Sequence, residues 1–130
     1  KENLLCLAKE LGVENQFHLL GYRTDALKLY RAADSFVFPS FREGLSVSMM
    51  EAMASGCPIV CSQIRGNVDL VEKEKGGYLF NPVDWQALSL NLKKLIDNKL
   101  LCEQFGKCNK KNIDSFGQIN VIQTMGNIYK

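Results

Sequence analysis

The sequence lacks the features by which several classes of protein are recognised. Its 130 residues contain a single histidine, His18, and five cysteines with no C-x-x-C pair, so no zinc site is predicted. No apolar run approaches the ~20 residues needed to cross a bilayer, and no secretory cleavage pattern follows the first residues. The net charge of +2 gives no indication of a nucleic-acid surface.

The amino-acid composition is typical of one soluble globular domain over residues 1–130. The apolar fraction is 46% and the charged fraction 23%, both ordinary values for such a domain. Most of the cysteines lie in apolar or helical contexts, which favours buried free thiols in a reducing cytoplasm. His18 lies in a short apolar run and is interpreted as a packed or sheet-edge residue rather than a ligand.

Hydrophobic periodicity predicts strands that alternate with helices along the chain. This alternation implies an α/β fold, a Rossmann-like parallel sheet with helices on both faces. In such folds ligands bind at the carboxyl ends of the strands. Strands are expected at 17–21, 35–40 (continuous and buried), 58–62 and 76–80, and helices at 4–11, 24–34, 45–55, 66–72, 84–98, 99–111 and 118–129.

Two glutamates bracket the start of the expected helix 45–55 in the stretch "REGLSVSMMEAMASGCPIV". Glu43 lies in the loop before the helix, next to a glycine that lets the backbone approach a ligand closely. Glu51 lies about 9 Å further along the axis at ~1.5 Å per residue. The free N–H groups of Leu45, Ser46 and Val47 would favour an anion between them. A sugar nucleotide, with hydroxyls on both sides of a diphosphate, matches this layout.

Both glutamates also have an ordinary structural interpretation. Glu43 can be a carboxylate that interacts favourably with a helix N-terminus, and Glu51 can be a solvated residue on a helix surface. Glu51 is the harder of the two to explain in this way. Its neighbours along the helix are apolar, so a charge there needs partners or a polar cleft.

The segment "RAADSFVFPSFREGLSVSMMEAMASGCPIVCS" resembles the donor-binding signature of the retaining glycosyltransferases of family four. The signature pairs two glutamates, here Glu43 and Glu51, within E-G-x-x-x-x-x-x-E-A-M-A-x-G-x-P, and the resemblance extends over most of residues 10–97. It implies the GT-B fold, in which two Rossmann-like halves face a cleft. The chain would be the C-terminal, donor-binding half, without its first strand.

The resemblance also implies roles for individual residues. Glu43 would be the catalytic group and would accept hydrogen bonds from hydroxyls of the transferred sugar. The backbone N–H groups around Gly44, Leu45 and Ser46 would contact the sugar or the diphosphate. Glu51 would hold the ribose hydroxyls.

The loop "GYRTD" is similar to the loop that lines the nucleobase in this family. Tyr22 and Arg23 are therefore candidates for contacts with the base. For Arg23 an ordinary surface charge is an equally good interpretation.

The implied reaction moves a hexose from a nucleoside-diphosphate sugar to an acceptor hydroxyl and keeps the anomeric configuration. No cofactor or metal is expected, since no D-x-D motif or histidine cluster is present to hold Mg²⁺ or Mn²⁺. The acceptor, a sugar or a lipid-linked sugar, would bind through an N-terminal half. The complete enzyme is expected in the cytoplasm, with peripheral association at the inner face of the membrane, and without a nucleic-acid partner.

The sequence also departs from the family pattern. Many relatives carry G-G-x-x-E where this chain has "RGNVDLV", with Asn67 and Asp69 at the second glycine and the glutamate. The form "IRGN" is associated with bacterial surface-polysaccharide assembly. The Gly-Arg segment and the lysine that neutralise the diphosphate in relatives are missing, which indicates a fragment with an exposed sheet edge and no turnover of its own.

Two other interpretations remain open from the sequence. The chain can be a non-catalytic nucleotide-binding or interaction module that keeps the fold. It can also be a different Rossmann-like protein, such as a response-regulator-like domain, although the early acidic cluster and phosphoacceptor aspartate of that class are not found.

Overall fold

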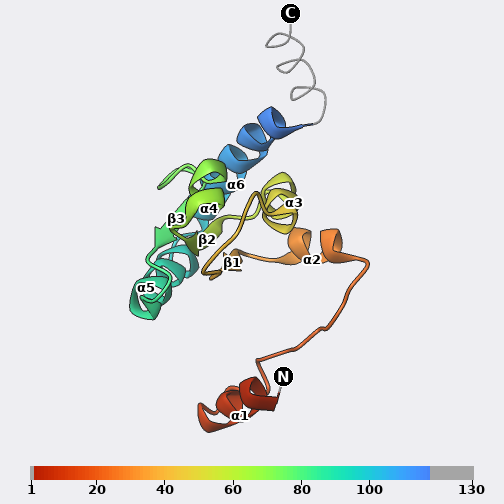
Figure 1. The fold of residues 1–130 in the computed structure, drawn as a ribbon, viewed down its shortest axis with the longest axis vertical. Coiled ribbons are helices and arrows are strands. Elements are labelled where there is room, and N and C mark those ends of the chain that lie inside the picture. The colour runs from red at the N-terminus through yellow and green to blue at the C-terminus, as the bar shows by residue number, and fades with distance from the viewer. Residues whose placement is uncertain (1, 118–130) are drawn as a thin grey trace, which may run out of the picture.

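The computed structural model describes residues 2–117 and contains a three-stranded parallel sheet surrounded by helices (Figure 1). The strand order is β1–β2–β3, so each strand lies beside the next one in the sequence. The strands are β1 (Phe36–Phe38), β2 (Ile59–Ser62) and β3 (Gly77–Phe80). The helices are α1 (Glu2–Glu10), α2 (Ala26–Ala32), α3 (Val47–Ser55), α4 (Arg65–Leu70), α5 (Trp85–Ile96), α6 (Lys99–Ile113) and the 3₁₀ helix η1 (Asp114–Phe116).

The central strand β2 contributes to both hydrophobic clusters of the core. Ile59 and Cys61 pack on one face with residues of α3 and α4, whereas Val60 packs on the other face with Leu95 and Phe105 of α5 and α6. Successive side chains of a strand point to opposite faces, so a fully apolar strand needs a layer on each side. The predicted α/β class, with helices on both faces of a parallel sheet, is confirmed.

The elements around the predicted site form for local reasons that the sequence already indicates. The side chain of Ser46 accepts a hydrogen bond from the Met49 N–H, which caps the start of α3. Gly56 ends the helix in the left-handed region at φ +86°, a conformation that favours glycine. Asp84 and Asn98 cap α5 and α6 in the same way as Ser46 caps α3.

Asn109 of α6 joins segments that lie far apart in the sequence. Its Nδ2 donates to the carbonyl oxygens of Cys57, just after α3, and Gly76, just before β3, each at 2.7 Å. Asn109 has no solvent exposure. Buried carbonyl groups need a donor, and the Gly76 carbonyl has a second one in the Ile59 N–H at 3.2 Å. Through Asn109, α6 therefore holds the segment before β2 and the segment before β3 together.

The predicted strand at 17–21 is wrong. Residues 17–21 are irregular, and His18 is exposed rather than packed or at a sheet edge. A strand requires a neighbour for its backbone hydrogen bonds, and none of β1–β3 lies beside this segment. Figure 1 shows α1 apart from the sheet, joined to α2 by an extended segment.

Other expectations need smaller corrections. The strand predicted at 35–40 spans only Phe36–Phe38, and Val37 is 37% exposed rather than buried. Among the cysteines, Cys57 and Cys61 are buried as expected, but Cys6 is exposed, and Cys102 and Cys108 are half-buried. Burial raises the pKa of the Cys61 thiol to about 12. The helix predicted at 118–129 lies outside the described residues.

Replacing Asn109 with alanine should destabilise the domain. The substitution leaves the buried Cys57 carbonyl oxygen without a donor and removes one of the two donors to the Gly76 carbonyl oxygen, at a cost of roughly 1–3 kcal/mol in the free energy of unfolding. Urea denaturation followed by circular dichroism would measure the change. The matched control is Lys111→Ala at an exposed position of the same helix, where a change within about 0.5 kcal/mol is expected. Equal stability of the two variants would contradict the role given to Asn109.

Candidate functional site

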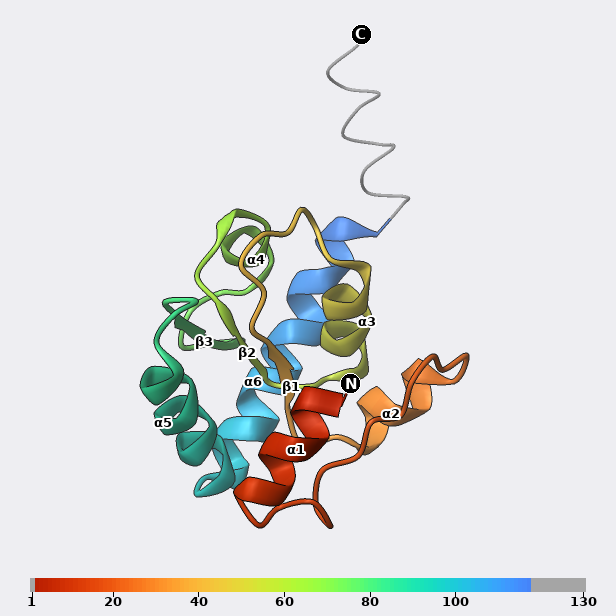
Figure 2. The same cartoon turned by 60° about the horizontal axis from the view of Figure 1, so that its bottom comes forward.

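The loop that leads from β1 to α3 carries Glu43 at the carboxyl end of the sheet. Figure 2 shows this loop rising beside α4 before the chain enters α3. Phe38, the last residue of β1, pairs with Cys61 of β2, so the loop begins where both strands end. Glu43, Gly44 and Leu45 are exposed. This is the edge of a parallel sheet at which the sequence predicts ligand binding.

Gly44 leaves open space at the surface of this loop. A Cβ built on Gly44 would meet no atom within 4 Å, and its φ lies outside the left-handed region. The backbone conformation and the packing around that Cβ position therefore do not require glycine here. A glycine next to Glu43 does permit a ligand to approach the backbone closely.

The start of α3 presents hydrogen-bond donors close to Glu43. The helix begins at Val47, two residues later than predicted, because Ser46 serves as its N-cap. Within the described residues, the N–H groups of Val47 and Ser48 have no acceptor, and the Ser46 and Ser48 hydroxyls lie 2.9 Å apart. Free N–H groups at a helix start favour an anion. The sequence prediction placed these donors at 45–47 and so missed Ser48; the preference of serine for N-cap positions was the available signal.

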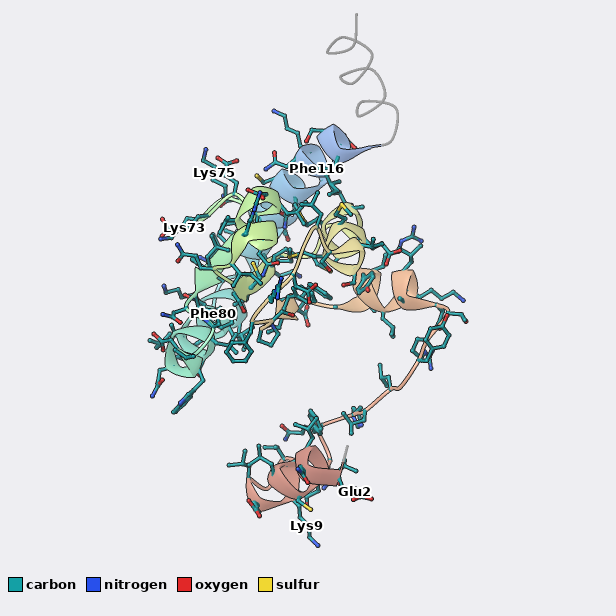
Figure 3. The ribbon with its side chains drawn as sticks, in the orientation of Figure 1. Glu2, Lys9, Lys73, Lys75, Phe80 and Phe116 are labelled. Atoms are coloured by element: carbon teal, nitrogen blue, oxygen red, sulfur yellow. The ribbon has the colours of Figure 1, made fainter. Side chains whose placement is uncertain are left out.

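Glu51 lies on the next turn of α3 and is half-buried. It lines a shallow hollow of about 340 Å³ together with apolar residues of α3. The other side of the hollow is formed by Ile113, Asp114, Phe116 and Gly117, of which Figure 3 labels Phe116. Burial, with a smaller contribution from the charge of Glu51, raises the pKa of Tyr30. Glu51 is thus neither fully solvated nor ion-paired within residues 2–117.

Gly66 of α4 packs against the backbone of the β1–α3 loop. The sequence prediction did not include this contact. A Cβ on Gly66 would lie 1.8 Å from the Gly44 carbonyl oxygen, so the two backbones are in direct contact. The neighbouring Asn67 is fully buried and donates from Nδ2 to the Ser62 carbonyl oxygen at 2.9 Å. The only signal in the sequence was the glycine in "RGNVDLV".

Tyr22 and Arg23 are not brought to this site by the described structure. Tyr22 is 93% exposed, and Arg23 forms an ion pair with Asp25 at 2.7 Å. This pairing raises the pKa of Arg23 and lowers that of Asp25. Figures 1 and 2 both show the segment before α2 running apart from α3. Their predicted contact with a nucleobase stays a prediction.

Taken together, the β1–α3 loop and α3 offer a carboxylate, several amide donors and a second carboxylate in one continuous segment. Carboxylates accept hydrogen bonds from hydroxyl groups, and amide donors bind phosphate oxygens. The segment can therefore bind a ligand that carries hydroxyls on both sides of an anionic centre. None of the helices within residues 2–117 combines the length and the apolar composition of a membrane-spanning segment.

Comparisons with known proteins identify the family. The family described as "Glycosyl transferases group 1" matches residues 1–112. A UDP-Gal:α-D-GlcNAc-diphosphoundecaprenol α-1,3-galactosyltransferase of Escherichia coli is 29% identical over 120 residues, which cover 92% of this chain and 31% of that protein.

Two solved structures show the same fold. The chain superimposes on Anabaena HepE, crystallised in complex with UDP, with a TM-score of 0.91 and 25% identity, covering 98% of this chain and 36% of HepE. It also matches the C-terminal domain of the Francisella tularensis group 1 glycosyltransferase LpcC, with a TM-score of 0.78, 25% identity and coverage of 88% of this chain and 60% of that one.

The chain spans about a third of the length of HepE and of the E. coli galactosyltransferase. The predicted relationship to glycosyltransferases of the GT-B fold is confirmed by these matches, and a response-regulator-like domain is excluded. The chain belongs to the glycosyl transferases of group 1.

Proposed function

We propose that the segment from Glu43 to Glu51 binds the nucleotide-sugar donor of a retaining glycosyltransferase. The enzyme would transfer a hexose from a nucleoside diphosphate to an acceptor hydroxyl, in the synthesis of bacterial surface polysaccharide or glycolipid. The observation that carries the proposal is the open surface at Gly44, between the Glu43 carboxylate and the free N–H groups of α3. The diphosphoundecaprenol-linked acceptor named for the E. coli relative supports a lipid-linked acceptor.

Each part of this segment would contact a different part of the donor. Glu43 would accept hydrogen bonds from hydroxyls of the transferred sugar and hold its anomeric carbon toward the acceptor. The N–H groups at the start of α3 would stabilise the charge that develops on the leaving diphosphate, without requiring a metal ion. Glu51, one turn later, would accept hydrogen bonds from the ribose hydroxyls.

The reaction takes place between the sugar, which Glu43 would hold, and the diphosphate, which the N–H groups of α3 would hold. The bond between the anomeric carbon and the diphosphate oxygen breaks, and its electron pair leaves with the diphosphate. The acceptor oxygen forms the new glycosidic bond to the anomeric carbon and passes its proton to the departing diphosphate. Preorganised donors at the diphosphate favour this step because the negative charge there increases as the bond breaks. Glu43 contributes by positioning the sugar, an effect that is sensitive to small displacements.

Replacing Glu51 with alanine should weaken the binding of the nucleotide itself. In the longest natural polypeptide that carries this sequence, the dissociation constant for UDP should rise roughly ten- to a hundredfold, since hydrogen bonds to a charged group contribute about 1.5–3 kcal/mol. Isothermal titration calorimetry would measure it. Glu103→Ala, at an exposed glutamate of α6, is the control and should bind UDP normally. Unchanged affinity in Glu51→Ala would refute the ribose role.

Replacing Glu43 with glutamine or alanine should affect turnover and spare nucleotide affinity. The steady-state kcat with the sugar donor should fall at least about tenfold, because the reacting sugar loses its positioning contact. The dissociation constant for UDP should stay within about twofold of the original, because UDP has no transferred sugar. Loss of UDP affinity with normal turnover would count against this assignment. UDP binding with no turnover in the unmodified protein would instead favour a non-catalytic binding module.

A further inference from the structure

We propose that Gly66 is a positioning residue for the transfer reaction, because its missing side chain sets the place of the loop that carries Glu43. The inference rests on the proposed function of Glu43. Gly66 itself would touch neither the donor nor the acceptor. It would act through its contact with the backbone of Glu43 and Gly44.

The contact is closer than any side chain allows. A Cβ on Gly66 would lie 1.8 Å from the carbonyl oxygen of Gly44, 2.5 Å from its carbonyl carbon and 3.2 Å from the carbonyl oxygen of Glu43. Real Cβ atoms essentially never approach another heavy atom closer than 3.0 Å. The φ of Gly66 lies outside the left-handed region, so alanine is not opposed by the backbone conformation there. The requirement for glycine comes from the contact alone.

If a side chain were introduced at Gly66, the loop would move and α4 would stay. The start of α4 is fixed by the buried Asn67, which donates to the Ser62 carbonyl oxygen at 2.9 Å. Ser62, also fully buried, donates from Oγ to the Phe38 carbonyl oxygen at 3.4 Å. These bonds tie α4 to the ends of β2 and β1.

The loop on the other side of the contact has no comparable anchor. Glu43, Gly44 and Leu45 are exposed, and no side-chain hydrogen bond or ion pair within residues 2–117 involves them. A methyl group at Gly66 therefore displaces this loop by more than an ångström. The three atoms nearest to a Cβ at Gly66 belong to Gly44 and Glu43 and none belongs to α3, so the proposed ribose contact of Glu51 is preserved.

Displacement of Glu43 by this amount has a defined kinetic consequence. A misplacement of about 1 Å in a group that positions substrate can lower a rate roughly a hundredfold. Gly66→Ala should thus reproduce the effect of losing Glu43 without touching it. Gly66→Ala is therefore expected to lower kcat while nucleotide affinity stays the same. A general loss of stability would not lower kcat selectively in this way.

The test compares Gly66→Ala with a matched control in the longest natural polypeptide that carries this sequence. Gly66→Ala should lower kcat with the sugar donor roughly ten- to a hundredfold and leave the dissociation constant for UDP within about twofold. The control is Gly106→Ala on α6, where a Cβ would lie 2.3 Å from the Gly56 carbonyl oxygen, at the far end of α3 from the loop. It carries a similar clash and should lower the melting temperature but keep kcat within about twofold. Equal losses of kcat in the two variants would overturn the proposal.

A double-mutant cycle separates positioning from general damage. In a Glu43→Ala background, Gly66→Ala should lower kcat less than twofold further, because the group it displaces is already gone. An undiminished loss in that background would overturn the proposal. If Gly66→Ala does not fold, Asn67→Ala is the second variant, because it releases α4 from Ser62. Asn67→Ala should lower kcat and leave the dissociation constant for UDP unchanged. Loss of UDP affinity in Asn67→Ala would overturn the proposal. A Glu43→Ala variant with normal kcat would reject the proposed function itself, whatever Gly66→Ala does.

Discussion

The burial of β2 on both faces is the constraint on which the described structure depends. Ile59, Val60 and Cys61 are fully buried, so each side of this strand requires its own helical layer. The helices α3 and α4 supply one layer and α5 and α6 the other. In Figure 3, Phe80 of β3 is labelled on the sheet beside α5, and it belongs to the second cluster. With both faces covered, polar chemistry is confined to the ends of the strands and the loops that leave them.

The buried end of β2 also determines what surrounds the proposed donor site. Ser62 is fully buried, and it bonds to the end of β1 through Oγ and to Asn67 through its carbonyl oxygen. These bonds place α4 directly against the exposed loop that carries Glu43. The helix α4, which these hydrogen bonds hold to the strands, and the exposed loop thus meet at one backbone contact, between Gly66 and Gly44. This arrangement lets a part of the chain without buried side chains of its own present Glu43 in a defined place.

The parts of this structure that depend on local sequence could be predicted, and those that depend on distant contacts could not. The helix α3 follows from its apolar run and the stop at Gly56, and its start was predicted two residues too early because Ser46 is its N-cap. Residues 17–21 have the composition of a strand, but strand formation depends on a neighbour that the local sequence does not specify. The apolar pattern that predicted full burial of Val37 likewise failed, because β1 lies at the edge of the described sheet.

For the candidate site, the sequence indicated both glutamates and Gly44, the glycine beside Glu43 in the loop. It did not indicate the contact between Gly66 and Gly44, since backbone proximity between separate segments leaves no local pattern. Glu43 and Glu51 are proposed to face the two ends of one nucleotide-sugar. The most direct test is a crystal structure of the longest natural polypeptide carrying this sequence, with UDP bound. A ribose hydroxyl is expected within about 2.5–3.0 Å of a Glu51 carboxylate oxygen, with diphosphate oxygens at the start of α3. A ribose bound elsewhere, with the Glu51 carboxylate left in solvent, would contradict this proposal.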